Sequence, residues 1–180
     1  TFIGHSFGGS VAMRAALEYK KKLNNLILLE PNAFFILDKK QHSSSYNIAH
    51  SFGKKIYEAQ KKSNWNKFAK IFLEFWIGFG SWEKMTPKQQ HNFLLVIPNI
   101  YYEAQAIFNE NMNLKEFINF QKNIFFINAK NTNFISKEIK RVFISILPEI
   151  IHTELEEGDH MAPIKYSEII NPLIYQHLKN

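Results

Sequence analysis

Hydrophobic residues in this chain follow two patterns, which together predict an alternation of strands and helices. Short apolar runs bounded by turn residues are typical of buried strands, and they occur at 2–3, 26–29, 123–129 and 149–155. Apolar residues at helical spacing follow the first, third and fourth runs, at 9–20, 136–147 and 166–178. Strands that alternate with helices form parallel sheets covered on both faces. We therefore predict an α/β fold with a mostly parallel sheet built from these four strands.

The long stretch between the second and third runs has a different pattern. No part of it reads as a convincing strand, whereas helical spacing occurs at 46–62, 64–76, 86–109 and 113–121. Phe68, Ile71 and Phe72 are an example of this spacing. A structureless connection of this length would be unusual in a compact domain. We therefore predict a core formed by 1–33 and 119–180, with 34–118 inserted as a helical cap.

Composition and charge narrow the class of protein. The chain has 180 residues, of which 46% are hydrophobic and 21% charged, as expected for one globular domain. It contains no cysteine, which excludes disulfides and thiolate metal sites and agrees with a reducing, cytoplasmic location. The net charge of +6 comes mostly from scattered lysines without a nucleic-acid-binding motif, so we expect no nucleic-acid partner. No apolar run is long enough to predict a membrane-spanning helix.

The most informative motif is Gly4-His5-Ser6-Phe7-Gly8, which matches G-x-S-x-G between a predicted strand and a predicted helix. In that context the serine lies on a sharp turn, where small neighbours allow a close approach of the backbone. Ser6 is therefore the candidate nucleophile. The backbone N–H of Phe7, at the start of the helix, is the candidate donor to an oxyanion. A turn that merely joins strand to helix is the structural alternative.

A nucleophilic serine requires a base, and His160 is the best candidate. It follows the last predicted strand, at the carboxyl end of the sheet, where catalytic groups of open α/β sheets gather. A solvent-exposed loop histidine is the alternative. The remaining histidines fit less well, because they adjoin the nucleophile or lie in the insertion, in a strand or in the last helix: His5, His42, His50, His91, His152 and His177.

These residues carry a resemblance to a known superfamily. GHSFGGS near the start and GDHMAPI near the end resemble the α/β-hydrolase fold superfamily, and FLEFWIGFGSWEKM resembles the lid of bacterial hydrolases within it. The resemblance covers the chain only from the superfamily's nucleophile strand onward. It implies an incomplete core, without the first strands and without the loop that supplies the second oxyanion donor. We therefore expect a fragment of a hydrolase, whose activity on its own is an open question.

The acid of the triad departs from the superfamily's common pattern. Most members have an aspartate after the strand that corresponds to 123–129, but here that position reads Ala-Lys-Asn-Thr-Asn around Asn131. Some members place the carboxylate after the preceding strand, which ends here in Glu30. We therefore predict Glu30 as the acid, with an amide near Asn131 as the alternative. Asp159 is too close to His160 in sequence to face it easily, and Asp38 is a distant reserve.

Together these residues predict a serine hydrolase that acts on an apolar ester or related acyl substrate through a Ser-His-acid triad. Carbon–carbon bond hydrolysis is compatible with the same residues. The rival interpretation is a binding module or inactive remnant that keeps the fold. No cofactor or metal is expected, and the oligomeric state is open. The residues expected to bind substrate are the neighbours of the triad and aromatic residues of the cap: His5, Phe34, Phe35, Trp76, Phe79, Trp82 and Met161.

Overall fold

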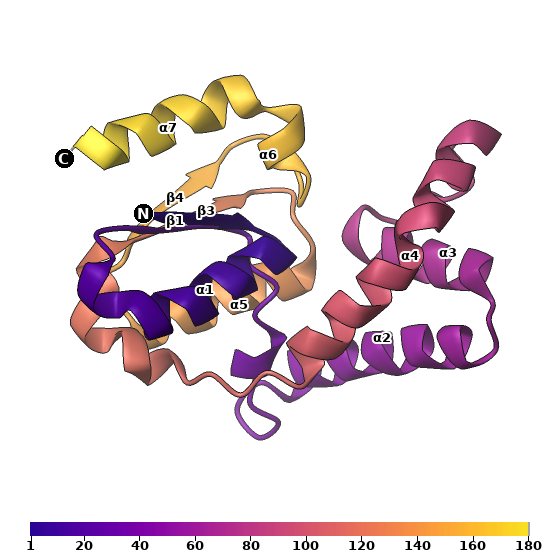
Figure 1. The fold of residues 1–180 in the computed structure, drawn as a ribbon, viewed down its shortest axis with the longest axis horizontal. Helices are drawn as coiled ribbons and strands as arrows, with labels where there is room; N and C mark the ends of the chain where they lie inside the picture. The colour runs from indigo at the N-terminus through magenta and orange to yellow at the C-terminus, as the bar shows by residue number, and fades with distance from the viewer. Residues whose placement is uncertain (180) are drawn as a thin grey trace.

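The computed structural model describes residues 1–179 and contains one parallel sheet (Figure 1). Its strands lie side by side in chain order: β1 (Phe2–His5), β2 (Leu26–Leu29), β3 (Ile124–Ala129) and β4 (Ile151–Leu155). Each neighbouring pair is parallel. Every residue of β2 and β3 is buried, which explains why their sequences are apolar apart from Asn128. The predicted parallel sheet is confirmed.

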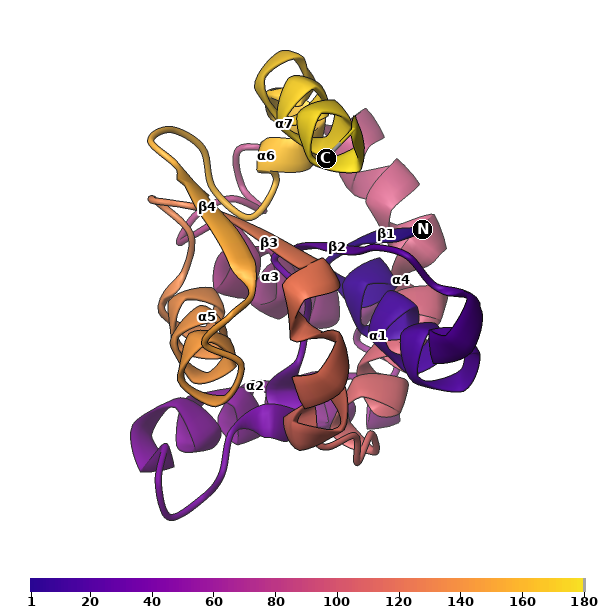
Figure 2. The same ribbon diagram turned by 90° about the vertical axis from the view of Figure 1, so that its left-hand side faces the viewer.

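Helices cover both faces of this sheet (Figure 2). On one face lie α1 (Phe7–Tyr19) and α5 (Phe134–Ile146), and on the other lie the short α6 (Ala162–Lys165) and α7 (Ser167–Lys179). The strands supply apolar side chains to the two layers in alternation, as the two-residue period of a strand requires. The α/β class and the flanking helices agree with the sequence prediction.

The two hydrophobic cores follow this alternation. Leu28 and Phe126, paired in register, belong to the core that includes α1 and α5. Ile27 and Ile127 belong to the core beneath α6 and α7. Because the strands are parallel, their carboxyl ends meet at one edge of the sheet, and the turns that follow β1, β2 and β4 come together there.

Three long helices lie within the predicted insertion: α2 (Ser43–Lys61), α3 (Trp65–Trp76) and α4 (Pro87–Phe108). They pack against one another beside the sheet, as Figure 1 shows, largely through aromatic rings. Phe52 of α2 stacks on Phe75 of α3 with ring centroids 3.9 Å apart. An ion pair between Arg14 of α1 and Glu110, just after α4, links this group to the sheet's helices.

Two local elements differ from the sequence prediction. The helix expected at 113–121 is the 3₁₀ helix η3 (Leu114–Asn123), and its apolar residues Leu114, Phe117 and Phe120 recur at the three-residue period of that helix type. Helix α6 was not predicted, because four residues are too few to show a hydrophobic period. Two further 3₁₀ turns, η1 (Lys20–Lys22) and η2 (Phe34–Ile36), join longer elements.

Candidate active site

Ser6 lies on a sharp turn between β1 and α1. Its φ of 56° is in the left-handed region, which residues other than glycine seldom adopt. The turn needs glycine at position 4, because a Cβ there would lie 2.2 Å from the carbonyl oxygen of Gly8. A Cβ on Gly9 would come within 2.9 Å of the Pro31 Cα. A Cβ on Gly8 would meet no atom within 4 Å. Of the two glycines after Ser6, it is therefore Gly9 whose missing side chain allows another part of the backbone to come close.

His160 comes from the loop between β4 and α6 and meets the serine. Its Nε2 lies 2.9 Å from the Ser6 Oγ, and the residue is only 3% exposed. The loop is held by Asp159, whose carboxylate accepts from the Met161 N–H and pairs with Lys165 at 2.7 Å. Asp159 therefore faces away from the imidazole.

Glu30 follows β2 and completes a hydrogen-bonded series with these two residues. Its Oε2 lies 2.9 Å from the His160 Nδ1. It also has a positive φ, 44°, which turns the chain sharply at the end of the strand. Only three residues other than glycine in 1–179 have a positive φ, and two of them are Ser6 and Glu30. Strained backbone conformations are concentrated at functional sites, so the positive φ values of Ser6 and Glu30 indicate such a site.

The segment after β3 holds the Glu30 carboxylate in place. The backbone N–H of Ala129 donates to Oε1 at 2.8 Å, and the hydroxyl of Thr132 donates to Oε2 at 2.6 Å. Asn131, the residue considered as an alternative to Glu30, is exposed, and its backbone N–H donates to the Gly158 carbonyl. Asp38, the other reserve, is exposed and caps the backbone N–H groups of Lys40 and Gln41.

These contacts define the protonation pattern of His160. The carboxylate accepts from Nδ1, so Nδ1 carries the proton and Nε2 is free to accept from the Ser6 hydroxyl. His5 supports the same loop, because its Nε2 lies 2.7 Å from the His160 carbonyl oxygen, to which it donates. Burial, and then repulsion from a charged His160, lower the pKa of His5, which favours its neutral form.

A small cavity of about 40 Å³ opens at Ser6. Trp76 of α3 forms part of its wall and stacks on the His160 ring, with centroids 4.1 Å apart. Asn32, after β2, lines it from the side of the sheet. The remaining lining residues are mostly aromatic or aliphatic and come from α1, η2 and the helices α2–α4: Phe7, Phe34, Phe52, Phe72, Ile100, Glu103, Ala104, Ile107 and Phe108.

The residues expected to bind substrate fall into two groups. Phe34 and Trp76 line the cavity at Ser6, and His5 lies behind His160. The others lie elsewhere. Phe35 lines a separate cavity with Tyr46 and His50, and Phe79 is 89% exposed on the loop after α3. Trp82 is buried within that loop, and Met161 precedes α6 outside the cavity lining.

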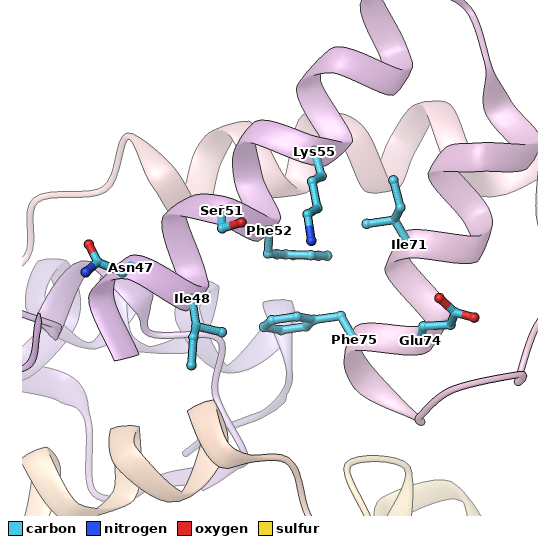
Figure 3. A pocket seen from close by; sticks show the side chains of 8 residues that line it. All are labelled: Asn47, Ile48, Ser51, Phe52, Lys55, Ile71, Glu74 and Phe75. Atoms are coloured by element: carbon cyan, nitrogen blue, oxygen red, sulfur yellow. The ribbon is translucent and has the colours of Figure 1, made fainter. Parts of the chain in front are cut away.

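A larger cavity of about 450 Å³ is lined by residues of α2 and α3 (Figure 3). The stacked rings of Phe52 and Phe75 form part of its wall, with Lys55 on one side and Glu74 on the other. Phe52 also lines the cavity at Ser6, so its ring separates the two spaces.

Two solved structures have a backbone similar to that of this chain. A proposed non-heme bromoperoxidase from Mycobacterium tuberculosis matches with a TM-score of 0.62 and 11% sequence identity. A carboxylesterase from the ammonia-oxidizing thaumarchaeon Nitrososphaera gargenis matches with a TM-score of 0.62 and 15% identity. Both are α/β-hydrolase fold proteins. The chain has the α/β-hydrolase fold.

Each match covers 98% of this α/β-hydrolase-fold chain and 65% of the other chain. The chain thus spans slightly less than two thirds of the length of these neighbours. No protein-family model and no curated protein sequence matches it. The turn that carries Ser6 and the loops that carry Glu30 and His160 lie in the part that the fold comparison covers.

Within residues 1–179, no cluster of three or more histidine or acidic side chains is arranged to hold a metal ion. None of the described helices is both long enough and apolar enough to span a bilayer.

Proposed function

We propose that this chain carries the catalytic residues of a serine hydrolase that cleaves a carboxylic ester or a related acyl compound. The observation that carries the proposal is the hydrogen-bonded series from the Ser6 hydroxyl through His160 to Glu30, in which both contacts are 2.9 Å long. This geometry gives the serine a base, and the base an anion that selects its tautomer.

The proposed reaction begins when the Ser6 Oγ attacks the acyl carbon of the substrate. His160 Nε2 takes the hydroxyl proton and later passes it to the leaving alcohol, while Glu30 stabilises the imidazolium. The N–H of Phe7 belongs to the first turn of α1, where N–H groups have no partner within the helix. It is therefore available to donate to the oxyanion. Water then releases the acyl group from Ser6 by the same route in reverse.

Two observations support a reactive rather than a purely structural role for Ser6 and Glu30. The positive φ values of Ser6 and Glu30 keep the backbone in unfavourable conformations. Ser6 also faces a cavity, whereas a purely structural serine would need none.

The proposal is tested with the purified protein that contains this chain and a fluorophosphonate probe, which labels activated serines. We expect the probe to modify Ser6, and Ser6→Ala to abolish both labelling and hydrolysis of a p-nitrophenyl ester. Glu30→Gln should lower kcat by about 10³-fold to 10⁴-fold, because the imidazole loses its tautomer control. Ser10→Ala, in the same helix but outside the cavity lining, is the control and should label normally. Labelling that survives in Ser6→Ala would refute the proposal. A complete absence of labelling and hydrolysis would favour the rival interpretation, a binding module.

A further inference from the structure

The cavity at Ser6 contains a carboxyl group for which the proposed hydrolysis has no use. Glu103 of α4 lines this cavity together with Ser6. Within the described residues, no group donates a hydrogen bond to its carboxyl group or forms an ion pair with it. Burial alone raises the pKa of Glu103.

The position of Glu103 on its helix offers no structural reason for a carboxyl group. Ile100 and Ile107 lie three and four residues away along the same face of α4, and both line the same cavity, as does the neighbouring Ala104. Ala104 and Ile107 are 6% and 5% exposed, so an apolar residue would suit the face better. A polar group that is partly buried without a partner destabilises the folded chain. A hydrogen-bond donor or a cation inside the cavity would therefore stabilise the Glu103 carboxylate.

A second polar group in the cavity also lacks a hydrogen-bond partner. Asn32 is 5% exposed and lines the cavity, and its buried Oδ1 has no hydrogen-bond partner in the described part of the chain. Glu103 and Asn32 come from different elements, α4 and the turn after β2. Both offer unused hydrogen-bond acceptors, so the complementary ligand is a donor of hydrogen bonds.

The aromatic residues that line the cavity favour a hydrogen-bond donor that is positively charged. Aromatic residues make up half of the cavity lining, and the faces of aromatic rings attract cations. A carboxylate among aromatic rings favours an ammonium group over a neutral hydroxyl. The cavity volume of about 40 Å³ leaves room for a group of a few atoms, since one water needs about 10–15 Å³ by the same measure. A primary ammonium group fits this space better than a bulkier quaternary one.

We propose that the substrate of Ser6 carries a primary ammonium group, which Glu103 and Asn32 bind inside the aromatic cavity. The proposal rests on the proposed function, because it assigns a substrate class to the same site. Glu103 acts here as a specificity-determining residue. The ammonium group replaces the solvent that the carboxylate lost on burial, and the aromatic rings exclude competing water.

The test compares p-nitrophenyl esters of β-alanine and of butanoic acid, which differ by an ammonium group in place of a methyl group. A longer pair, from ε-aminocaproic acid and heptanoic acid, covers a greater distance between the cation and the ester. We expect at least one ammonium ester to be preferred, and Glu103→Gln to lower kcat/KM for it about tenfold. The same variant should leave kcat/KM for the methyl partner unchanged or higher. Glu58→Gln, which removes a charge from an exposed position of α2, should leave the ratio unchanged.

The outcomes separate this inference from the proposed function. If the uncharged esters are hydrolysed at Ser6 but Glu103→Gln leaves the ratio between partners unchanged, the inference is wrong and the proposed function stands. If no ester is cleaved and the fluorophosphonate probe does not label Ser6, both are wrong. Should Glu103→Gln fail to fold, inhibition of butanoate ester hydrolysis decides the question in the unmodified protein. Propylammonium should inhibit more strongly than propanol, and equal inhibition would refute the inference.

Discussion

The strand ends and the helices α2–α4 contribute to the candidate active site in opposite ways. At the strand ends the carboxyl group of Glu30 and the ring of His160 are fully engaged. Glu30 accepts from Ala129, Thr132 and His160, and both ring nitrogens of His160 have partners. In the helices, two residues that line the cavity carry a polar group without a hydrogen-bond partner among residues 1–179: Trp76, through its buried Nε1, and Glu103, through its carboxyl group.

This difference teaches how the two regions divide the work under the proposed function. A side chain with all its hydrogen bonds satisfied stays in one geometry, as a reacting group requires. A side chain without a partner gains free energy when a ligand supplies one, as a group that selects substrate requires. On this interpretation the loops after the strands hold the reacting groups, and the helices, together with Asn32 after β2, determine which acyl group is accepted.

The largest expected effect is a loss of stability at the turn that carries Ser6, and it tests how rigidly the strand ends are built. Gly4→Ala should destabilise the protein by about 3 kcal/mol or more, or prevent folding, because the new Cβ meets a backbone oxygen at 2.2 Å. Gly8→Ala is the matched control, because it lies in helix α1 with open space around its Cβ. It should be neutral or stabilise by up to about 1 kcal/mol, since alanine favours helices. Urea unfolding of both variants measures the difference, and equal midpoints would contradict the assigned geometry.

A smaller effect, on rate rather than folding, is expected from the residue that holds Glu30. Thr132→Val keeps the shape but removes the hydroxyl that donates to the Glu30 Oε2 at 2.6 Å. We expect kcat for ester hydrolysis to fall about tenfold to a hundredfold. KM should change little, because Thr132 does not line the cavity.

Rescue by the conservative variant distinguishes positioning from packing at this residue. Thr132→Ser restores the hydroxyl but loses the methyl group, so it should recover most of the rate. If the serine variant is as slow as the valine variant, the hydrogen bond from residue 132 to Glu30 does not determine the rate. The claim that hydrogen bonds at the strand ends hold the reacting groups in place would then be weakened.

The sequence predicted most of what depends on strand topology. Apolar runs predict the four strands, the G-x-S-x-G motif predicts Ser6, and the place of His160 after the last strand predicts the base. Glu30 follows from the resemblance to α/β-hydrolases that have the acid after the preceding strand. All three residues follow strands at the same edge of a parallel sheet, and the structure has them at hydrogen-bond distance.

The sequence did not predict the groups that surround these three residues. Thr132 looked like one polar residue in a loop, and Glu103 like one charge on an amphipathic helix. Their neighbours depend on how α4 and the loop after β3 are placed in three dimensions, and no local pattern records that. Aromatic content likewise did not distinguish Trp76, which stacks on His160, from Phe79, which is 89% exposed. The only signal in the sequence for Glu103 is a glutamate at helical spacing from Ile100 and Ile107, with no lysine or arginine at 99–107 to pair with it.

The smallest expected effect is on stability, and it tests whether the Glu103 carboxylate destabilises the folded chain in the absence of substrate. Burial raises the pKa of Glu103 above its ordinary 4.5, so the folded chain binds this proton more tightly than the unfolded chain. Stability from this group is therefore complete below pH 4.5 and is lost as the pH rises through the raised pKa. Glu103→Gln, which never ionises, should unfold at a higher temperature than the unmodified protein at pH 7, and the difference should shrink toward pH 4.5. Glu58→Gln, at an exposed site, should show no such trend. If Glu103→Gln is less stable than the unmodified protein at pH 7, the carboxylate of Glu103 has a stabilising partner in the folded chain. The statement that helix α4 carries an unpaired polar group would then be wrong.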